Sequence, residues 1–448
     1  MFLTLLGIMF LAVKRGYAQE STLTILSNEA QVDFPETVTF RLELEAGQKP
    51  AEATLIYQLG QNNCLAAGTQ VPVEISGPIL EWTWVMSRSG NPPPGAEMWW
   101  QWHITDSAGH TIITPKEQLT FSDDRFDWQN ETATADGSAP IRLNWYEGDE
   151  VGPILLDAAV AGLERLEQDV GIELQGDVQF FIYGDTADMR EALLYVPDWA
   201  GGIAFSEYNT ILIGVPPYSV ETYGKDTVRH ELAHLVIGQF ARSCLGGSLP
   251  TWLSEGLAVF AEGEAGDEIA ADINEGIQNN TFQPVRSLNG AFPSQDDQAR
   301  AAYSQSYSLV AFLLDNYGQE KMAALLQTLA GGAGYDSALE QVYGFNADGL
   351  EVAWRSAIGA SPRQIPPTPT PLTAAGIPTA LPLDAAESRP TPSPAPGSAA
   401  NDASATNSPT ASSDSIEVCG FGLAPLLLIG GLGVIPANRR RRRKTKKI

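Results

Sequence analysis

The sequence predicts a multi-domain protein in which an all-β sandwich of the immunoglobulin or fibronectin type III kind precedes an α+β domain. The chain has 448 residues, more than one ordinary domain holds, and its hydrophobic content of 44% is enough for a sizeable core. Its first part alternates apolar and polar residues with a period of two. Its middle part instead places apolar residues at helical spacing between short apolar runs.

The sandwich is expected over residues 20–125. Short runs of alternating residues, separated by turns, are typical of this fold. A proline-rich turn, "SGNPPPGA", separates two tryptophan-rich runs. His103 and His110 lie in this region and are expected to be structural. The runs that we interpret as strands are residues 38–46, 53–60, 79–86 and 97–106.

The α+β domain is expected over residues 139–360. A helical pattern at 154–171 precedes a buried strand at 177–184, and residues 201–217 suggest a hairpin of two strands. Several helical patterns, each closed by glycine, end this part of the chain.

The charge of the chain excludes one class of partner. The net charge is −27, and eight of the 27 basic residues lie in the last ten positions, so the remainder carries 19 basic residues against 54 acidic ones. A body this acidic repels nucleic acid. The three cysteines, Cys64, Cys244 and Cys419, are too few and too far apart for a disulfide framework or a zinc–thiolate cluster.

Both ends of the chain suggest export. Residues 1–18 read as a signal peptide, although Lys14 and Arg15 follow the apolar run instead of preceding it. Residues 361–417 are rich in Pro, Thr, Ser and Ala, as expected of a disordered stalk. Residues 419–448 combine an apolar run with a basic cluster, as in a membrane anchor or a sorting signal.

The strongest chemical signal is the sequence His230-Glu231-Leu-Ala-His234. Apolar neighbours predict a helix here, with Asp226 as its N-cap. On a helix the two histidines are one turn apart and share a face, and two neutral imidazoles at this spacing are natural Zn²⁺ ligands. Glu231 is then placed to act as a general base for water.

A catalytic zinc site needs a third protein ligand. Glu255 is the preferred candidate, because it lies in "PTWLSEGLAVFAEG", where Pro250 can start a second helix with an apolar face. Glu262, further along the same helix, is a weaker substitute. Cys244 lies between the histidines and Glu255, but Glu255 suits the role better.

The combination of His230-Glu231-x-x-His234 with Glu255 in "WLSEGLA" resembles the gluzincin metallopeptidases, in particular the peptidase MA-like family and, more distantly, the M1 aminopeptidases. The resemblance covers about residues 140–358 and implies a zinc-dependent hydrolase of gluzincin type. It implies that Tyr303 stabilises the oxyanion, with Tyr307 as the alternative and helix packing as a third possibility.

The same resemblance implies that residues 201–205, "GGIAF", form the edge strand that aligns the substrate. The Gly-x-Met-Glu-Asn motif of the aminopeptidases is absent, which argues against recognition of a free amino terminus.

The resulting hypothesis is an exported zinc metallopeptidase that is tethered to the cell surface and hydrolyses peptide bonds with Glu231 as general base. Its partners would be a protein or peptide substrate and a membrane. Two alternatives stay open: a catalytically inactive surface protein that uses the sandwich for binding or adhesion, and a zinc amidase that acts on a non-peptide amide. Substrate preference and oligomeric state do not follow from the sequence.

Overall fold

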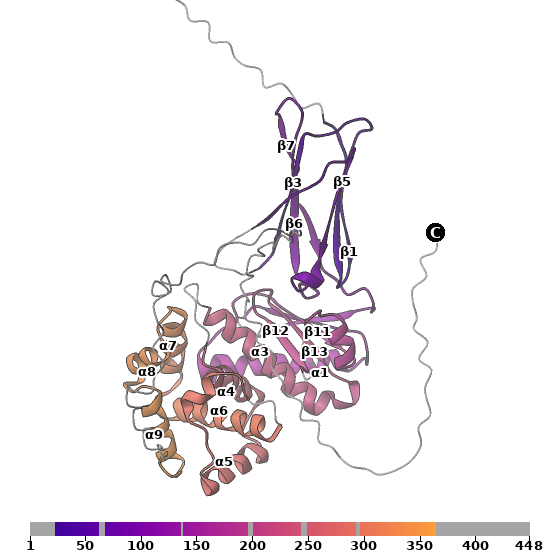
Figure 1. Cartoon of the computed structure of the whole chain (residues 1–448). Coiled ribbons are helices and arrows are strands. Elements are labelled where there is room, and N and C mark those ends of the chain that lie inside the picture. Colours follow the sequence, from indigo (N-terminus) through magenta and orange to yellow (C-terminus); the bar gives the residue numbers. More distant parts are fainter. Residues whose placement is uncertain are drawn as a thin grey trace, which may run out of the picture.

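The computed structural model describes residues 23–61, 68–135, 138–195, 200–242, 249–292 and 296–363. An all-β region is followed by a region that is mostly helical, which confirms the predicted order of fold classes (Figure 1). The predicted signal peptide, the stalk beyond residue 363, the segment 419–448 and all three cysteines lie outside the described residues.

Two sheets face each other in the sandwich. One has the order β1-β2-β5, and the other has the order β4-β3-β6-β7, with β8 also paired to β6. All of their strand pairs are antiparallel. The strands are β1 (Ile25–Asp33), β2 (Thr37–Leu44), β3 (Glu52–Leu59), β4 (Thr69–Pro72), β5 (Ile79–Val85), β6 (Glu97–Thr105), β7 (Thr111–Ile113) and β8 (Glu117–Thr120), with a short 3-10 turn η1 (Met86–Arg88) after β5.

The alternation along β6 shows how the sandwich core forms. Met98, Trp100, Trp102 and Ile104 are buried, whereas the residues between them are partly or fully exposed. The buried set packs against residues such as Phe40 of β2, as expected for strands with one face toward a core. The predicted half-buried strands are therefore present, and His103 lies on the outer face.

The second domain is built on a sheet with the order β12-β13-β11-β10-β9. β11 is parallel to β10 and to β13, while the two edge strands are antiparallel to their neighbours. β9 lies ahead of residue 139, the predicted start of this domain, so the sheet begins earlier in the chain than expected. The strands are β9 (Gln129–Thr134), β10 (Pro140–Trp145), β11 (Val178–Tyr183), β12 (Gly202–Phe205) and β13 (Thr210–Gly214).

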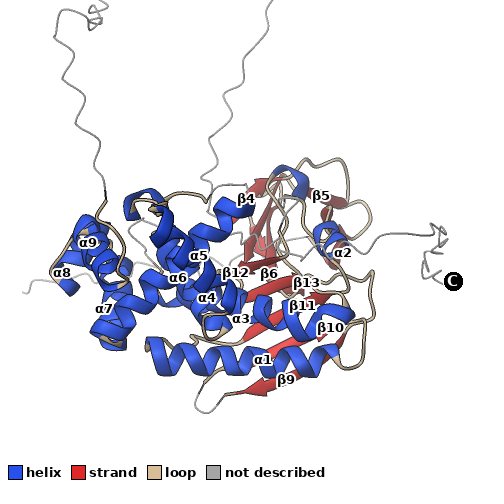
Figure 2. Cartoon of the chain, turned by 90° about the horizontal axis from the view of Figure 1, so that it is seen from below, coloured by secondary structure: helices blue, strands red, loops and turns tan. Residues whose placement is uncertain are grey.

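Both faces of this sheet are covered. Figure 2 shows α1 (Val151–Arg165) and α3 (Lys225–Phe240) beside one face. Along β11, Phe180 and Ile182 belong to the core that includes these helices, whereas Phe181 and Tyr183 belong to a second core that includes α2 (Thr186–Glu191). Parallel strands buried on both faces read as continuous apolar runs, which is why "VQFFIY" has no polar alternation.

The sandwich contacts the second domain through its proline-rich turn. The Asn91 side chain donates to the carbonyl of Ala192 over 2.8 Å and accepts from the amide of Leu194 over 2.9 Å. Arg125 reaches from the segment after β8 to Glu191 and to the carbonyl of Asp188. The end of α2 is thereby fixed against the sandwich.

The remaining helices form the lower part of the second domain. α3 begins at Lys225, directly after a π-helical turn, so Gly224 and not the predicted Asp226 precedes it. The longer helices are α4 (Thr251–Glu262), α5 (Asp267–Asn279), α6 (Asp296–Tyr317), α7 (Gln319–Ala330), α8 (Tyr335–Tyr343) and α9 (Ala347–Ala357). Short 3-10 or π-helical turns are η2 (Leu166–Val170), η3 (Pro217–Ser219), η4 (Val220–Gly224) and η5 (Val285–Asn289).

Ion pairs hold the last described residues. Arg363 donates to Glu351 over 3.0 Å and to Asp348 over 3.1 Å, and both acidic residues lie on α9. Glu351 also binds Arg355, and both side chains are buried. Within the described ranges, no helix is both long and apolar enough to span a bilayer, and the predicted span at 419–437 falls outside them.

A close approach of α4 to α6 depends on Gly256. A Cβ atom at this position would lie 2.5 Å from the carbonyl oxygen of Ser306 and 2.7 Å from the Val310 side chain. Because Gly256 follows Glu255 in the chain, this contact also fixes the turn of α4 that carries the predicted ligand.

We predict that Gly256→Ala lowers the free energy of unfolding by about 1–3 kcal/mol, the usual cost of overpacking. Thermal or denaturant unfolding measures the change. Gly290→Ala is the matched control, because a Cβ there meets no atom within 4 Å. Equal stability of both variants and the wild type would contradict the importance of the α4–α6 contact.

Candidate metal centre

The predicted site lies on α3, which is buried almost all round. Ten of its residues are buried, including the full run from His230 to Ile237, so the helix lies at the centre of the domain. It packs on α1, on α4 and on the strands β12 and β13. His230, Glu231 and His234 are each only 2% exposed, which places three polar side chains inside an apolar core.

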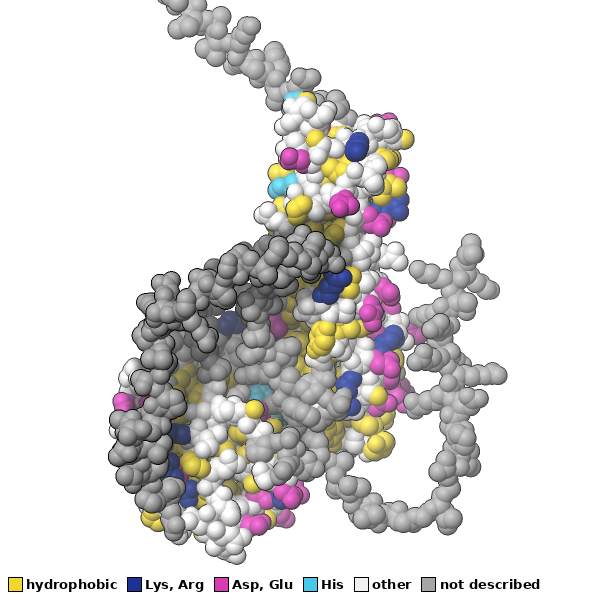
Figure 3. All heavy atoms as spheres, in the orientation of Figure 1, with side chains coloured by type: hydrophobic (Ala, Val, Ile, Leu, Met, Phe, Trp, Pro, Cys, Tyr) yellow, Lys and Arg dark blue, Asp and Glu magenta, His cyan; other side chains and the backbone are white. Residues whose placement is uncertain are grey.

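α3 and α4 bring the three predicted ligands together. His230 Nε2 lies 3.2 Å from His234 Nε2. Glu255 Oε2 lies 3.5 Å from His230 Nε2 and 3.4 Å from His234 Nε2. Within the described part of the chain, this is the only group of three His, Cys, Asp or Glu residues whose geometry suits a metal ion. Figure 3 shows histidine side chains in the lower half of the molecule, next to acidic ones.

The spacing of these atoms fits zinc. Ligand atoms about 2.0–2.1 Å from a tetrahedral zinc ion are separated from one another by about 3.3 Å. The three observed separations, 3.2, 3.4 and 3.5 Å, are close to this edge length. Two imidazole nitrogens and one carboxylate oxygen are also a ligand set that zinc accepts, and three protein ligands leave a fourth position for water or substrate.

The outer nitrogen of each imidazole has its own partner. His230 Nδ1 lies 2.7 Å from Glu262 Oε1, and His234 Nδ1 lies 3.0 Å from Ser254 Oγ. Such contacts fix the ring orientation and direct Nε2 toward the metal position. Glu262, predicted as a substitute ligand, therefore lies on the opposite side of the His230 ring from Glu255.

Burial and neighbouring charges shift the pKa values of His230 and Glu255 in opposite directions. Burial acts to lower the pKa of His230, but hydrogen bonds to Glu255 and Glu262 and the charges of these residues raise it to about 10. Burial acts to raise the pKa of Glu255, but the two histidines hold it well below its ordinary value. His230 is therefore protonated at neutral pH when no metal is bound, and a metal ion must displace this proton, so metal affinity falls on acidification.

Glu231 points from α3 toward the edge strand of the sheet. A Cβ atom on Gly202, the first residue of β12, would lie 2.7 Å from Glu231 Oε1 and 2.8 Å from its Cγ. The absence of a side chain at Gly202 lets the strand pass directly over this carboxylate. The edge strand that residues 201–205 were expected to form is thus next to the predicted general base.

Of the two candidate tyrosines on α6, Tyr303 is the one beside the ligands. Its ring centre lies 6.4 Å from that of His230 and 5.1 Å from that of Phe292. Tyr307 instead stacks on Phe260 with 6.1 Å between ring centres. Tyr303 is therefore the candidate tyrosine whose ring is in contact with the His230 ring.

Sequence reasoning did not identify the roles of three residues. Glu262 follows Glu255 by two turns on the same helix and shares its face, so a search for polar residues on that face would have found it. Ser254 precedes Glu255 and projects about 100° away from it, so its position gave no such signal. Gly202 gave a weaker signal, a Gly-Gly pair at the start of a buried strand.

Two helices that present an HExxH pair and a more distant glutamate to one point define a mononuclear metallohydrolase-type centre. Residues 158–360, which include all of these groups, match the sequence profile of the Peptidase MA superfamily. This part of the chain is therefore similar to the Peptidase MA superfamily. The profile match and the His–His–Glu centre together support a zinc peptidase.

Solved structures with similarity to the chain include zinc metallopeptidases. The M1 zinc metallopeptidase from Deinococcus radiodurans has 14% identity, with 75% of this chain and 91% of that chain covered, at a TM-score of 0.34. Its E323A mutant bound to a Tyr-Ser-Ala substrate has 15% identity, with coverages of 75% and 93%, at a TM-score of 0.35. Native yeast LTA4 hydrolase has 12% identity, with coverages of 78% and 69%, at a TM-score of 0.31. No curated protein matches the sequence significantly.

We predict that Glu262→Ala weakens metal binding by about 10- to 100-fold, the usual effect of removing the partner of a ligating histidine. Glu262→Gln keeps an acceptor for His230 Nδ1 and is expected to lose less. Competition with a chelator measures the affinity. Glu264→Ala, an exposed glutamate nearby, is the control, and an equal loss in that variant would exclude a specific role for Glu262.

Proposed function

We propose that the protein is a zinc metallopeptidase that hydrolyses peptide bonds with Glu231 as its general base. The observation that carries this proposal is the set of three buried ligand atoms 3.2–3.5 Å apart, with both outer imidazole nitrogens held by partners. The match of residues 158–360 to a peptidase superfamily supports the same conclusion.

His230, His234 and Glu255 would hold the ion, and zinc at this position supplies a Lewis acid that acidifies water and polarises a carbonyl. Glu231 follows the first ligand on α3 and takes the proton of the attacking water. Its carboxylate lies against Gly202, so it cannot turn toward the strand. The Tyr303 hydroxyl donates a hydrogen bond to the oxygen that becomes negative.

β12 would align the substrate. It is an edge strand of the sheet, and an extended peptide can pair with such an edge through backbone hydrogen bonds. Its residues Gly202–Phe205 are all buried, and none of them is acidic. A free amino terminus therefore finds no carboxylate on this strand, and peptides with blocked amino termini are proposed as substrates.

We predict that Glu231→Gln retains about one zinc ion per chain but loses turnover by about a hundredfold or more, because the general base is removed while the ligands stay. Metal content and casein hydrolysis are measured on the full chain. The double variant His230→Ala, His234→Ala is the control and should lose the metal. Near-normal hydrolysis by Glu231→Gln would exclude the base role, and unchanged zinc in the double variant would exclude the ligand assignment.

We predict that Tyr303→Phe lowers kcat by about 10- to 1000-fold with little change in zinc content, since one oxyanion donor is lost. Tyr307→Phe is the matched control from the same helix, and its kcat should stay near the wild-type value. Steady-state kinetics on a blocked peptide separates kcat from KM. Equal kcat values for the two variants would contradict the assignment of Tyr303.

The proposed location is the outer cell surface. Its support is the sequence alone: an apolar start, a stalk at 361–417 and an apolar segment followed by Arg439–Arg443. The basic cluster would keep the C-terminus inside, and the stalk would act as a semi-extended spacer.

We predict that both folded domains are reached by an added protease or by a membrane-impermeant label on intact cells. A cytoplasmic protein of the same cells serves as the control for lysis. Recovery of the domains in the soluble cytoplasmic fraction, protected from the label, would contradict export and tethering.

A further inference from the structure

The outer face of the sandwich sheet that contains β6 carries a row of uncharged polar side chains around one tryptophan. Trp99 pairs across the sheet with Gln58 of β3 and with Gln118 of β8, and paired residues project to the same face. The next row along the sheet pairs Gln101 with Ile56, and Ile56 in turn with Gln70. Two glutamines therefore flank the indole directly, and Gln101 and Gln70 lie in the next row of the same face; none of the four is fully buried.

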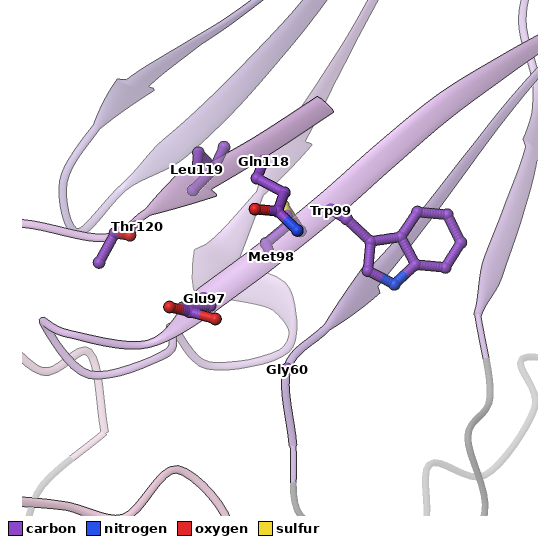
Figure 4. A pocket seen from close by; sticks show the side chains of 7 residues that line it. All are labelled: Gly60, Glu97, Met98, Trp99, Gln118, Leu119 and Thr120. Atoms are coloured by element: carbon purple, nitrogen blue, oxygen red, sulfur yellow. The ribbon is translucent and has the colours of Figure 1, made fainter. Parts of the chain in front are cut away.

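A cavity of 160 Å³ opens at the end of this face. Figure 4 shows Glu97, Gln118 and Trp99 among the side chains that line it, from β6 and β8. Gly60 lies opposite Glu97 and has no side chain to fill the space between them. Pockets for drug-sized ligands begin at about 300 Å³, so this one admits a single ring-sized group.

The tryptophan is in contact with a lysine side chain. The Lys116 ammonium lies 3.4 Å from the centre of the Trp99 ring, a cation–π contact. The side chain remains partly exposed on the sheet face. A rigid aromatic side chain loses little conformational entropy when it binds a ligand.

These features fit one class of ligand. A sugar ring presents C–H groups on its faces and hydroxyl groups around its edge, so an indole can contact the face while amides donate to and accept from hydroxyls. A peptide strand would need the free edge of a sheet, not the outer face of paired strands. The chain's acidity repels nucleic acid. The amides of the row carry no charge, and the two charged side chains beside it, Lys116 and Glu97, are opposite in sign, which suits a neutral polymer.

The cavity lies next to the second domain. Gln61, which follows Gly60, donates from Nε2 to the Tyr208 hydroxyl over 2.7 Å. Tyr208 belongs to the turn between β12 and β13, so the sheet face ends beside the hairpin that contains the edge strand. A polymer held on the face would therefore reach the domain that carries the metal centre.

We propose that this face, with Trp99 at its centre and Gln58, Gln101 and Gln118 around it, is a binding site for a neutral carbohydrate chain. This proposal does not depend on the proposed peptidase activity, because none of the residues of the binding site belongs to the metal centre. The cavity beside Gly60 would accept one sugar unit, with Glu97 accepting from its hydroxyls.

The test measures binding of the full chain to soluble neutral polysaccharides by calorimetry. The probes are laminarin, hydroxyethyl cellulose, amylose and chitohexaose, with dextran sulfate as a charged polymer and casein as a polypeptide. The expected result is binding to at least one neutral probe. Trp99→Ala and Gln118→Ala are each expected to raise its Kd by at least about tenfold, and Trp99→Phe should restore part of the affinity.

Tyr218→Ala is the matched control, because Tyr218 is an aromatic residue that is 91% exposed on the second domain. Its Kd should equal that of the wild type, and thermal unfolding should show that all variants are folded. Absence of binding to every neutral probe, binding to dextran sulfate or casein alone, or an unchanged Kd in Trp99→Ala and Gln118→Ala would each overturn the proposal. The Glu231→Gln variant should bind as the wild type does, which separates this result from any failure of hydrolysis.

Discussion

The burial of a carboxylate and two imidazoles at the interface of α3 and α4 is the constraint around which the second domain is arranged. Polar groups in an apolar interior cost free energy unless each has a partner. Glu255 faces both Nε2 atoms, while Glu262 and Ser254 face the two Nδ1 atoms. Each ring nitrogen of His230 and His234 therefore has a partner, which leaves the two imidazole rings little freedom to rotate.

Glycine at two positions allows the surrounding elements to come this close. Gly256 lets α4 pack against the backbone of α6, and Gly202 lets β12 pass over the Glu231 carboxylate. The metal position is thus enclosed by helices on one side and approached by a sheet edge on the other. Because both positions are closely packed, a larger side chain at Gly256 would push α4 away from α6, and one at Gly202 would push β12 away from Glu231.

The sequence predicted that His230 and His234 share a helix face, because they are one turn apart, and it named Glu255 from the helix pattern around it; the structure brings these three side chains together. The sequence also predicted the strands of the sandwich, since their alternation is regular. It did not predict that α3 is buried on all sides, because burial depends on α1, α4 and the sheet, which are distant in the chain. For the same reason the sequence suggested Glu262 as a substitute metal ligand, whereas in the structure its carboxylate contacts His230 Nδ1, on the side of the ring away from the metal position.

The ion pairs of Arg363 have a mechanical consequence. They join the last described residue to α9 through Asp348 and Glu351, and Arg355 ties Glu351 to the loop that carries Phe282. Tension applied to the chain beyond residue 363 is therefore delivered first to α9. From α9 the load passes to α6 through the hydrogen bond from Trp354 to Ser308 and to η5 through the hydrogen bond from Val285 to Glu351, so it reaches the helices around the metal centre through these contacts.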